Sequence, residues 1–214
     1  MMDCSALQVL ALLLDLLAWF CALSTALLPC WLTMSTPLLP MESYQLGLWQ
    51  SCVVQDVGGT ECRAYDSLLG LSENLKLARL LICSSLVLGM LGILLCGTGL
   101  ELVNSCEDRM KRTLSGVGGV LALLSGLLCL LPVSFVAHFA VKHFFDDTVP
   151  EVVPRWEFGD ALYCGWAAGF LQIVSGLLFV SHCWWWQTQL QPQPEVALQS
   201  RRQVMNVKTR CEYV

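Results

Sequence analysis

Long apolar stretches alternate with polar segments along the chain, and four of these stretches have the length of a helix that crosses a membrane. They cover residues 7–28, 78–100, 114–136 and 161–183. A spanning helix needs about 20 mostly apolar residues, because the hydrocarbon core offers no water and every backbone N–H and C=O group must be paired within the segment. The pattern therefore predicts a protein with four transmembrane helices.

The composition supports this interpretation. Hydrophobic residues make up 56% of the 214 residues, charged residues only 14%, and the mean hydropathy is +0.61, outside the range usual for a soluble globular domain. The last three apolar stretches also carry glycine at close intervals. Because small residues let transmembrane helices approach one another closely, we expect a compact, left-handed four-helix transmembrane bundle.

The first apolar stretch is interpreted as a membrane span and not as a cleaved secretory signal. Ala22-Leu23-Ser24 resembles a cleavage site, but no positive residue precedes the stretch and its apolar run is too long. Asp15 lies within it, where a charge costs at least ~2.5 kcal/mol unless it is paired, protonated or hydrated. Asp15 either contacts a polar group on another helix or is neutral and inert.

The positive charges indicate the orientation in the membrane. Four spans place both termini on one side, and seven of the twelve Lys and Arg residues lie in the connection 101–113 and the tail 184–214. Positive residues accumulate on the cytoplasmic side of membrane proteins. We therefore expect residues 1–6, 101–113 and 184–214 to be cytoplasmic, and residues 29–77 and 137–160 to be the two extracellular segments of a plasma-membrane protein.

The first extracellular segment contains a predicted β-hairpin. Strand-like stretches at 48–55 and 60–65 flank the sequence Asp56-Val57-Gly58-Gly59, which is typical of a turn. Of the twelve cysteines, only Cys52 and Cys62 lie well within an extracellular segment, where an oxidising environment preserves disulfides. A bridge between them would clamp the hairpin and stabilise it by roughly 2–4 kcal/mol.

A group of residues in and before this hairpin follows the pattern W-x17-W-x2-C-x9-C, and its members are Trp31, Gly47, Leu48, Trp49, Cys52 and Cys62. This group resembles the signature of the claudin family, within the superfamily that also includes the peripheral myelin proteins. Arg79 matches the arginine that the family places at the start of the second span, and residues 131–134 and 157–159 match family segments around the second extracellular loop. The cysteine pattern is shared with other four-span relatives, including receptor-auxiliary subunits.

The resemblance to claudins implies a fold and a function. In that family the first extracellular segment and part of the second form a small extracellular antiparallel β-sheet on the helices. The family polymerises in cis along the membrane and in trans across the intercellular gap. We therefore expect a structural and adhesive tight-junction component that forms a paracellular barrier or a charge-selective pore with other claudins. The alternative is an auxiliary subunit that modulates a channel or receptor.

The charges of the first extracellular segment give two opposing indications of ion preference. The segment holds five acids and two bases, a net charge of −3, which favours cations. By the resemblance, the residue after the second signature cysteine most influences ion choice, and here it is Arg63, a fixed cation that favours anions in a narrow passage. We expect a barrier or a weakly anion-favouring pore with Arg63 and Asp66 as selectivity candidates. The alternative is that all these groups are solvated surface charges and no pore exists.

The second extracellular segment has an apolar tip. Phe144 and Phe145 lie near Pro150 and Pro154, and exposed apolar groups of this kind mark protein contacts. The resemblance assigns the two aromatic residues to trans adhesion between cells. The alternative is that both rings pack on the sheet.

The cytoplasmic side carries two further predicted sites. Tyr213 and Val214 form an apolar C-terminus, which a PDZ domain binds by adding the peptide to the edge of a sheet. We expect a junctional PDZ scaffold as the partner. Cys106 and Cys183 lie near membrane boundaries and are palmitoylation candidates, the alternative being buried thiols.

The sequence contains no motif for catalysis. It has no redox-active C-x-x-C, no Ser/His/Asp grouping and no phosphate-binding loop, so we expect no enzyme activity and no cofactor. No cluster of His and Cys residues has the spacing of metal ligands. The expected partners are other claudins in homomeric and heteromeric assemblies, the PDZ scaffold and membrane lipid, and not nucleic acid.

Overall fold

The computed structural model describes residues 4–36, 39–55, 58–65, 73–100, 108–145 and 155–190. The helices are α1 (Cys4–Leu27), α2 (Glu73–Thr98), α3 (Asp108–Phe144) and α4 (Asp160–Leu190). The strands are β1 (Leu32–Thr36), β2 (Leu39–Leu46), β3 (Gln50–Gln55), β4 (Gly59–Ala64) and β5 (Trp156–Phe158). The chain divides after Val180 into two compact units, and the bundle and sheet described below belong to the first.

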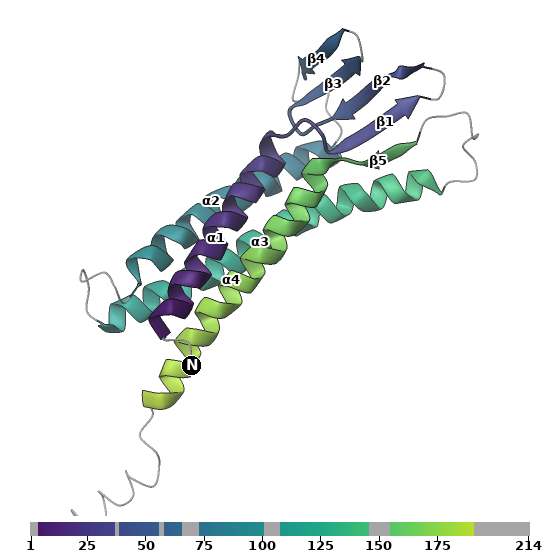
Figure 1. Cartoon of the computed structure of the whole chain (residues 1–214). Helices are drawn as coiled ribbons and strands as arrows, with labels where there is room; N and C mark the ends of the chain where they lie inside the picture. Colours follow the sequence, from purple (N-terminus) through teal and green to yellow (C-terminus); the bar gives the residue numbers. More distant parts are fainter. Residues whose placement is uncertain are drawn as a thin grey trace, which may run out of the picture. The chain divides into compact units, whose positions relative to one another are not determined.

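The four helices lie side by side, and the sheet is at one end of them (Figure 1). Each helix contains a stretch long and apolar enough to cross a membrane, namely Ala6–Leu27, Glu73–Thr98, Met110–Lys142 and Asp160–Trp185. The predicted combination of four apolar helices with a small antiparallel sheet is therefore confirmed.

The helices extend beyond the stretches that hydropathy marked. α2 begins at Glu73, five residues before the expected start at residue 78, and α3 continues through Pro132 to Phe144. The expected extracellular segment 137–160 is therefore helical in its first part. Hydropathy marks only the lipid-facing length of a helix, whereas polar residues in water can continue the same backbone hydrogen bonding.

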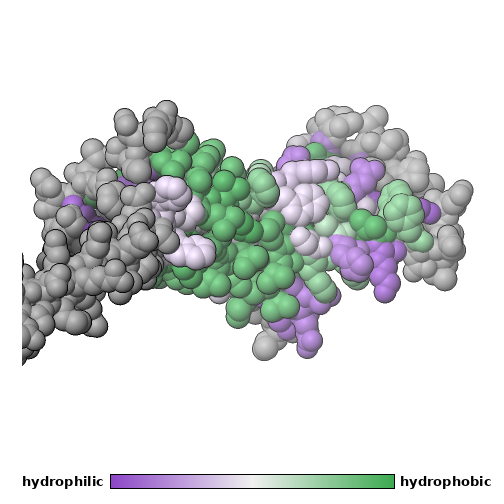
Figure 2. Space-filling view, turned by 90° about the horizontal axis from the view of Figure 1, so that it is seen from below, coloured by the Kyte–Doolittle hydropathy of each residue, from purple (hydrophilic) through white to green (hydrophobic). Residues whose placement is uncertain are grey.

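On α1, large apolar side chains face outward and small ones face inward. Ala11, Ala18 and Ala22 on α1 are at most 1% exposed, whereas Leu13 and Leu17 on the same helix are more than half exposed. Figure 2 shows the resulting hydrophobic surface over the helices, with hydrophilic residues gathered toward the sheet. This distribution suits a surrounding lipid, because association of helices in a membrane depends on close packing of small residues.

Paired glycines bring α3 and α4 together. A Cβ atom added to Gly126 would lie 2.8 Å from the Gly169 carbonyl oxygen, and one added to Gly169 would lie 3.0 Å from the Gly126 carbonyl oxygen. Gly119 and Gly176 form a second such pair, with distances of 3.1 and 2.7 Å. The backbones approach too closely at these two points for any larger residue.

The sheet has the strand order β4-β3-β2-β1-β5, with every neighbouring pair antiparallel. The predicted hairpin is β3–β4, and Gly59 in its turn has a φ of 87°, which glycine adopts readily. β5 comes from the segment after α3 and pairs with β1, so Leu32 lies opposite Phe158. The segment between α3 and α4 thereby completes the sheet formed by the segment between α1 and α2.

A continuous apolar core joins the inner side of the sheet to the ends of the helices. Its buried members come from all four helices, the α1–β1 connection, β1 and the β2–β3 connection. They include Trp31, Leu48, Ile82, Val133 and Leu162. The sheet is therefore held on the bundle by shared packing and not only by the chain connections.

Candidate functional site

The residues of the predicted signature converge where the sheet meets the bundle. Arg79, in the second turn of α2, is 8% exposed, and its Nε donates a hydrogen bond to the Leu48 carbonyl oxygen at 2.7 Å. Its guanidinium carbon lies 4.9 Å from the ring centre of Trp49 and 5.4 Å from that of Tyr65. A desolvated guanidinium between two aromatic faces is held by cation–π attraction worth about 2 kcal/mol or more. Arg79 thus links α2 to the open end of the β3–β4 hairpin, where Trp49 precedes β3 and Tyr65 follows β4.

The two signature tryptophans bind the end of α1. Trp31 Nε1 donates to the Thr25 carbonyl oxygen at 2.9 Å, and Trp49 Nε1 donates to the Ala26 carbonyl oxygen at 2.8 Å. The last four carbonyl groups of a helix have no partner within the helix. The indole N–H groups satisfy two of them, which explains why tryptophan stands at both positions and not another large apolar residue.

Gly47 is required by a close approach of two chain segments. Its N–H donates to the Gln50 carbonyl oxygen at 2.9 Å. A Cβ atom at this position would lie only 2.5 Å from the Pro29 Cα atom, which is backbone and cannot rotate away. Glycine therefore allows the β2–β3 connection to pass directly over the end of α1.

Gly159 plays the corresponding part between β5 and α4. Its N–H donates to the Trp31 carbonyl oxygen at 3.0 Å, and the next helix begins with the Ala161 N–H donating to the Cys30 carbonyl oxygen at 3.0 Å. A Cβ atom at Gly159 would overlap the Cys30 carbonyl group. The contact joins β5 and α4 to the start of β1.

Tyr65 belongs to the same cluster, although sequence reasoning did not single it out. Its hydroxyl donates to the Gly47 carbonyl oxygen at 3.2 Å. Partial burial raises the pKa of the phenol above its ordinary 10.0, while the positive charge of Arg79 acts in the opposite direction. The phenol is therefore a neutral donor near pH 7. The sequence feature that could have identified Tyr65 was its position three residues after Cys62, at the end of a strand-like stretch.

The disulfide joins the two predicted cysteines. Cys52 on β3 and Cys62 on β4 are register partners and are bonded to each other. Cys52 is 1% exposed, whereas every residue of β4 is exposed. The bridge therefore ties an otherwise uncovered edge strand to the interior of the sheet.

Arg63 lies on that exposed edge strand. It is the register partner of Ser51, while Glu61 is the partner of Val53. Residues two apart on a strand point to the same face. Arg63 and Glu61 therefore share the face opposite Cys62. Asp66, the other selectivity candidate, lies outside the described residues.

The predicted aromatic pair stands at the end of α3 beside β5. The ring centres of Phe144 and Phe145 are 5.3 Å apart, and Phe145 is 73% exposed while Phe144 is 37% exposed. Arg155 Nη1 donates to the Phe144 carbonyl oxygen at 2.6 Å, and its guanidinium carbon lies 5.0 Å from the Phe144 ring centre. Phe144 is thus fixed against the segment leading into β5, and Phe145 projects from it.

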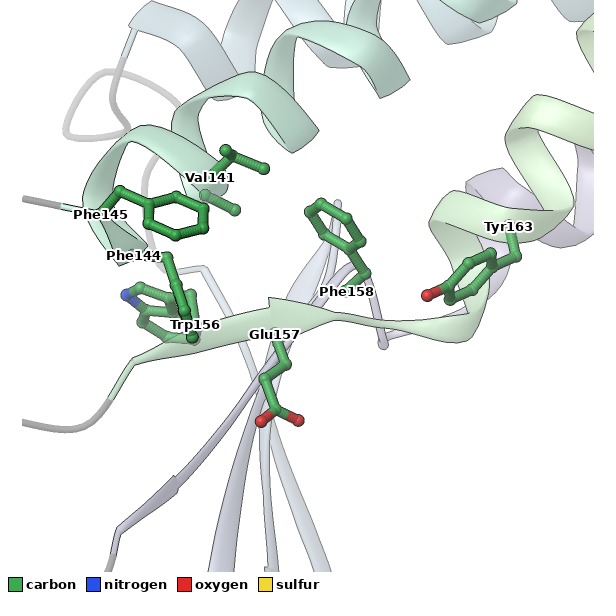
Figure 3. Close-up of a pocket in the computed structure, with 8 residues that line it drawn as sticks. Val141, Phe144, Phe145, Trp156, Glu157, Phe158 and Tyr163 are labelled. Carbon is green, nitrogen blue, oxygen red and sulfur yellow. The ribbon is translucent and has the colours of Figure 1, made fainter.

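An apolar cavity of about 350 Å³ opens beside this pair (Figure 3). In Figure 3 the rings of Phe144 and Phe145 lie near Trp156, and Phe158 and Tyr163 lie farther along β5 and α4. The lining residues are Ala140, Val141, Phe144, Phe145, Trp156, Glu157, Phe158 and Tyr163. Such a cavity can accept an apolar side chain from another molecule.

The remaining predicted sites lie mainly outside the described residues. Cys106, Tyr213 and Val214 all do. Cys183 is half-buried on α4, in the part of the helix that belongs to the second compact unit. In that same part Trp184 and Trp185 are 70% and 66% exposed.

The chain is similar to a known family and to named relatives. The model of the PMP-22/EMP/MP20/Claudin family matches residues 5–179. Claudin-3 of Mus musculus is 37% identical over 181 residues, which cover 83% of this chain and 82% of the relative. Claudin-4 of Bos taurus is 36% identical over 181 residues, which cover 83% of this chain and 86% of the relative. Claudin-4 of Homo sapiens is 35% identical over the same share of each chain.

Proposed function

The chain belongs to the PMP-22/EMP/MP20/claudin family, and from that premise we propose that it is a multi-pass plasma-membrane protein of tight junctions that polymerises into the paracellular barrier or a charge-selective pore. The observation that carries the proposal is the five-stranded sheet packed on the bundle. A sheet anchored by Arg79, Trp31 and Trp49 presents a rigid surface on one side of the membrane, as an adhesive component requires. The relatives reported above are claudins, which favours this function over the auxiliary-subunit alternative.

The proposed orientation places the sheet outside the cell and both termini inside. Its support is the Cys52–Cys62 disulfide, because such a bond persists in an oxidising compartment. Cysteine accessibility gives the test. A membrane-impermeant thiol reagent applied to intact cells is expected to label a cysteine introduced at Thr60 but not one introduced at Ser200. Labelling of the Ser200 position without permeabilisation would contradict the orientation.

The proposed adhesive surface is Phe145 with the neighbouring apolar cavity. Its support is the 73% exposure of the Phe145 side chain, next to a cavity lined mainly by apolar groups. An exposed apolar patch is costly in water and is covered when a second copy of the chain binds. Membrane lipid is the proposed environment of the outward-facing leucines, and palmitoylation of Cys183 or Cys106 stays a proposal.

The proposed cytoplasmic partner is a PDZ scaffold that binds Tyr213 and Val214. PDZ domains hold the terminal carboxylate and one apolar side chain, and removal of Val214 moves the carboxylate to Tyr213 and takes away the apolar side chain that the pocket holds. Deletion of Val214 is expected to abolish co-precipitation of a junctional PDZ scaffold while strand formation persists. Unchanged scaffold binding after the deletion would exclude this site.

The first experiment is freeze-fracture electron microscopy of fibroblasts that lack tight junctions and express only this chain. We expect continuous intramembrane strands at contacts between cells. The matched controls are Cys52→Ala, which removes the disulfide and should prevent strands, and Leu80→Ala, which changes one exposed side chain on α2. Delivery of the wild-type chain to the surface without strands would exclude autonomous polymerisation and favour an auxiliary subunit.

A further inference from the structure

Hydrogen bonds between polar side chains link α2, α3 and α4 in the middle of the bundle. Ser85 Oγ on α2 donates to the Ser125 carbonyl oxygen on α3 at 2.9 Å. Ser125 Oγ lies within hydrogen-bond distance of two acceptors, the Ser85 carbonyl oxygen at 2.7 Å and Gln172 Oε1 on α4 at 3.1 Å. All three side chains are completely buried. None of these polar residues was singled out from the sequence.

Two further hydrogen bonds connect α1 to this arrangement. Ser175 Oγ on α4 donates to the Ala11 carbonyl oxygen at 2.8 Å, and Trp19 Nε1 donates to the Leu86 carbonyl oxygen on α2 at 3.0 Å. Together with the bonds among Ser85, Ser125 and Gln172, these two bonds join α1 to α2, α2 to α3, α3 to α4 and α4 to α1. Asp15 lies on α1 between Ala11 and Trp19, four residues from each.

Asp15 is completely buried within this ring of contacts. Its exposed fraction is 0%, and neither carboxyl oxygen has a hydrogen-bond partner among the described residues. The side chain does not face lipid, since the outward positions of α1 are those of Leu13 and Leu17. A buried polar group without a partner is costly in a membrane protein and marks a site that holds something polar.

Gln172 supplies a complementary group at the same level of the bundle. It is 0% exposed, and its Nε2 has no hydrogen-bond partner within the described part of the chain. Ala11 on α1 and Ser175 on α4 meet where the two helices touch. Asp15 lies four residues after Ala11, and Gln172 lies three residues before Ser175. Because these helices run in opposite directions, both side chains lie about one turn from that contact, on the side toward the sheet.

Gly89 lets three side chains pack closely against α2. A Cβ atom added to Gly89 would lie 2.9 Å from Gln172 Nε2, 2.9 Å from Ser125 Oγ and 3.1 Å from Trp19 Cδ1. Trp19 lies one turn after Asp15 on α1. The unpartnered Gln172 donor and the unpartnered Asp15 acceptors therefore lie within about one turn of the same level in the bundle interior.

We propose that Asp15 and Gln172 form a buried hydration site, in which one water molecule donates a hydrogen bond to the Asp15 carboxyl group and accepts one from Gln172 Nε2. Water is the ligand that fits, because it can donate and accept at once, whereas a cation would be repelled by the amide N–H. A buried water needs two to four polar partners, and the site supplies both kinds. The water ties α1 into the polar contacts of the other three helices.

The test is a double-mutant cycle on the full-length chain in detergent, with Asp15→Leu, Gln172→Leu and the double variant. Each single change leaves the opposite polar group buried without its water, so each is expected to lower the unfolding midpoint temperature. The double variant leaves neither group and is expected to recover part of that loss, because removing both partners costs less than removing one. Additive shifts would overturn the proposal.

The control is Thr25→Val, because Thr25 is also completely buried on α1 but bonds to the Cys21 carbonyl oxygen of its own helix at 2.9 Å. It lies ten residues from Asp15, about 15 Å along the helix. Combined with Gln172→Leu, it is expected to give additive shifts. If Thr25→Val were coupled to Gln172→Leu as strongly as Asp15→Leu is, the coupling would reflect a general packing effect. That result would contradict the hydration site.

Infrared difference spectroscopy distinguishes a water from a direct bond between the two side chains. The spectrum of Asp15→Asn is subtracted from that of the wild type. Both spectra are recorded in ordinary water and in water labelled with heavy oxygen. A bound-water band that shifts with the label and disappears in Gln172→Leu is the expected result. Coupling in the mutant cycle without such a band would mean that the carboxyl and amide groups bond directly, and the hydration site would be wrong.

Discussion

Single residues at the base of the sheet are held by contacts that admit few alternatives. Arg79 combines a hydrogen bond to the Leu48 carbonyl oxygen with two aromatic faces, which a lysine could not reproduce because its ammonium is compact and not planar. Gly47 has a backbone atom where any side chain would begin. The geometry of one junction therefore explains these signature residues. Each makes or allows a contact that another residue type would not.

Gly47→Ala is expected to lower the free energy of unfolding by about 1–3 kcal/mol, as overpacking against a rigid neighbour does. The matched control is Gly97→Ala on α2, where an added Cβ atom meets nothing within 4 Å. That change should be neutral or stabilising by up to about 1 kcal/mol, because alanine favours helix. Unfolding midpoints in detergent, followed by tryptophan fluorescence, give both values, and equal effects of the two changes would contradict the close approach.

Tyr65 gives the junction a dependence on alkaline pH. Its pKa is raised in the folded chain above the ordinary 10.0, so the folded state binds this proton more tightly than the unfolded state. The corresponding stability is present below pH 10 and is lost as the pH rises through the folded-state pKa. The wild type should lose more stability than Tyr65→Phe between pH 9 and pH 11, as measured by unfolding midpoints. Parallel pH profiles would argue against a buried phenol.

At the scale of elements, the β3–β4 hairpin depends on its partners more than on its own packing. All six residues of β4 are exposed, and β4 has a neighbour on one side only. A short edge strand without a covered face is held by its ladder of backbone bonds and by the Cys52–Cys62 bridge. Two-stranded ribbons are marginal in water, so the covalent link has a large share in keeping β4 in place.

Reduction of the disulfide is therefore expected to destabilise the sheet by roughly 2–4 kcal/mol. A reductant should lower the unfolding midpoint of the wild type and leave that of the Cys52→Ser/Cys62→Ser double variant unchanged. Cys83→Ser, which removes an exposed free cysteine on α2, serves as the control and should respond to the reductant like the wild type. Equal midpoints of the double variant and the unreduced wild type would exclude a stabilising role.

At the scale of the whole molecule, two distant segments of sequence build one surface. β5 follows α3 and pairs with β1, which follows α1, so the segment after α3 forms one edge of the sheet while β4 forms the other. Arg63 lies on the β4 edge. In the proposed polymer, an influence of Arg63 on ions would depend on how the copies assemble.

Arg63→Glu is expected to shift the permeability of an epithelial monolayer toward cations, because the substitution reverses a fixed charge beside the passage. The measurement is the dilution potential for sodium chloride, and Arg63→Lys, which keeps the charge, is the control. The expected change is a severalfold rise in the ratio of sodium to chloride permeability. An unchanged ratio in monolayers with normal strands would place Arg63 away from any ion path.

The sequence by itself determined the features that depend on local composition. Four apolar stretches predicted the four helices, because a chain in lipid has to pair its backbone groups within each span. Cys52, Cys62 and the glycines of the turn indicated the hairpin, because a tight turn brings residues on either side of it together. The signature residues were found by resemblance, without the contacts that explain them.

The tertiary structure decided everything that joins segments far apart in the chain. The pairing of β5 with β1, the capping of α1 by Trp49, and the bond between Ser125 and Gln172 each link residues whose separation leaves no pattern in one sequence. Asp15 shows the difference most clearly. Its position in an apolar span marked a costly charge-bearing group, but only the packing of four helices placed it inside the bundle with no exposed surface, because burial is a property of neighbours.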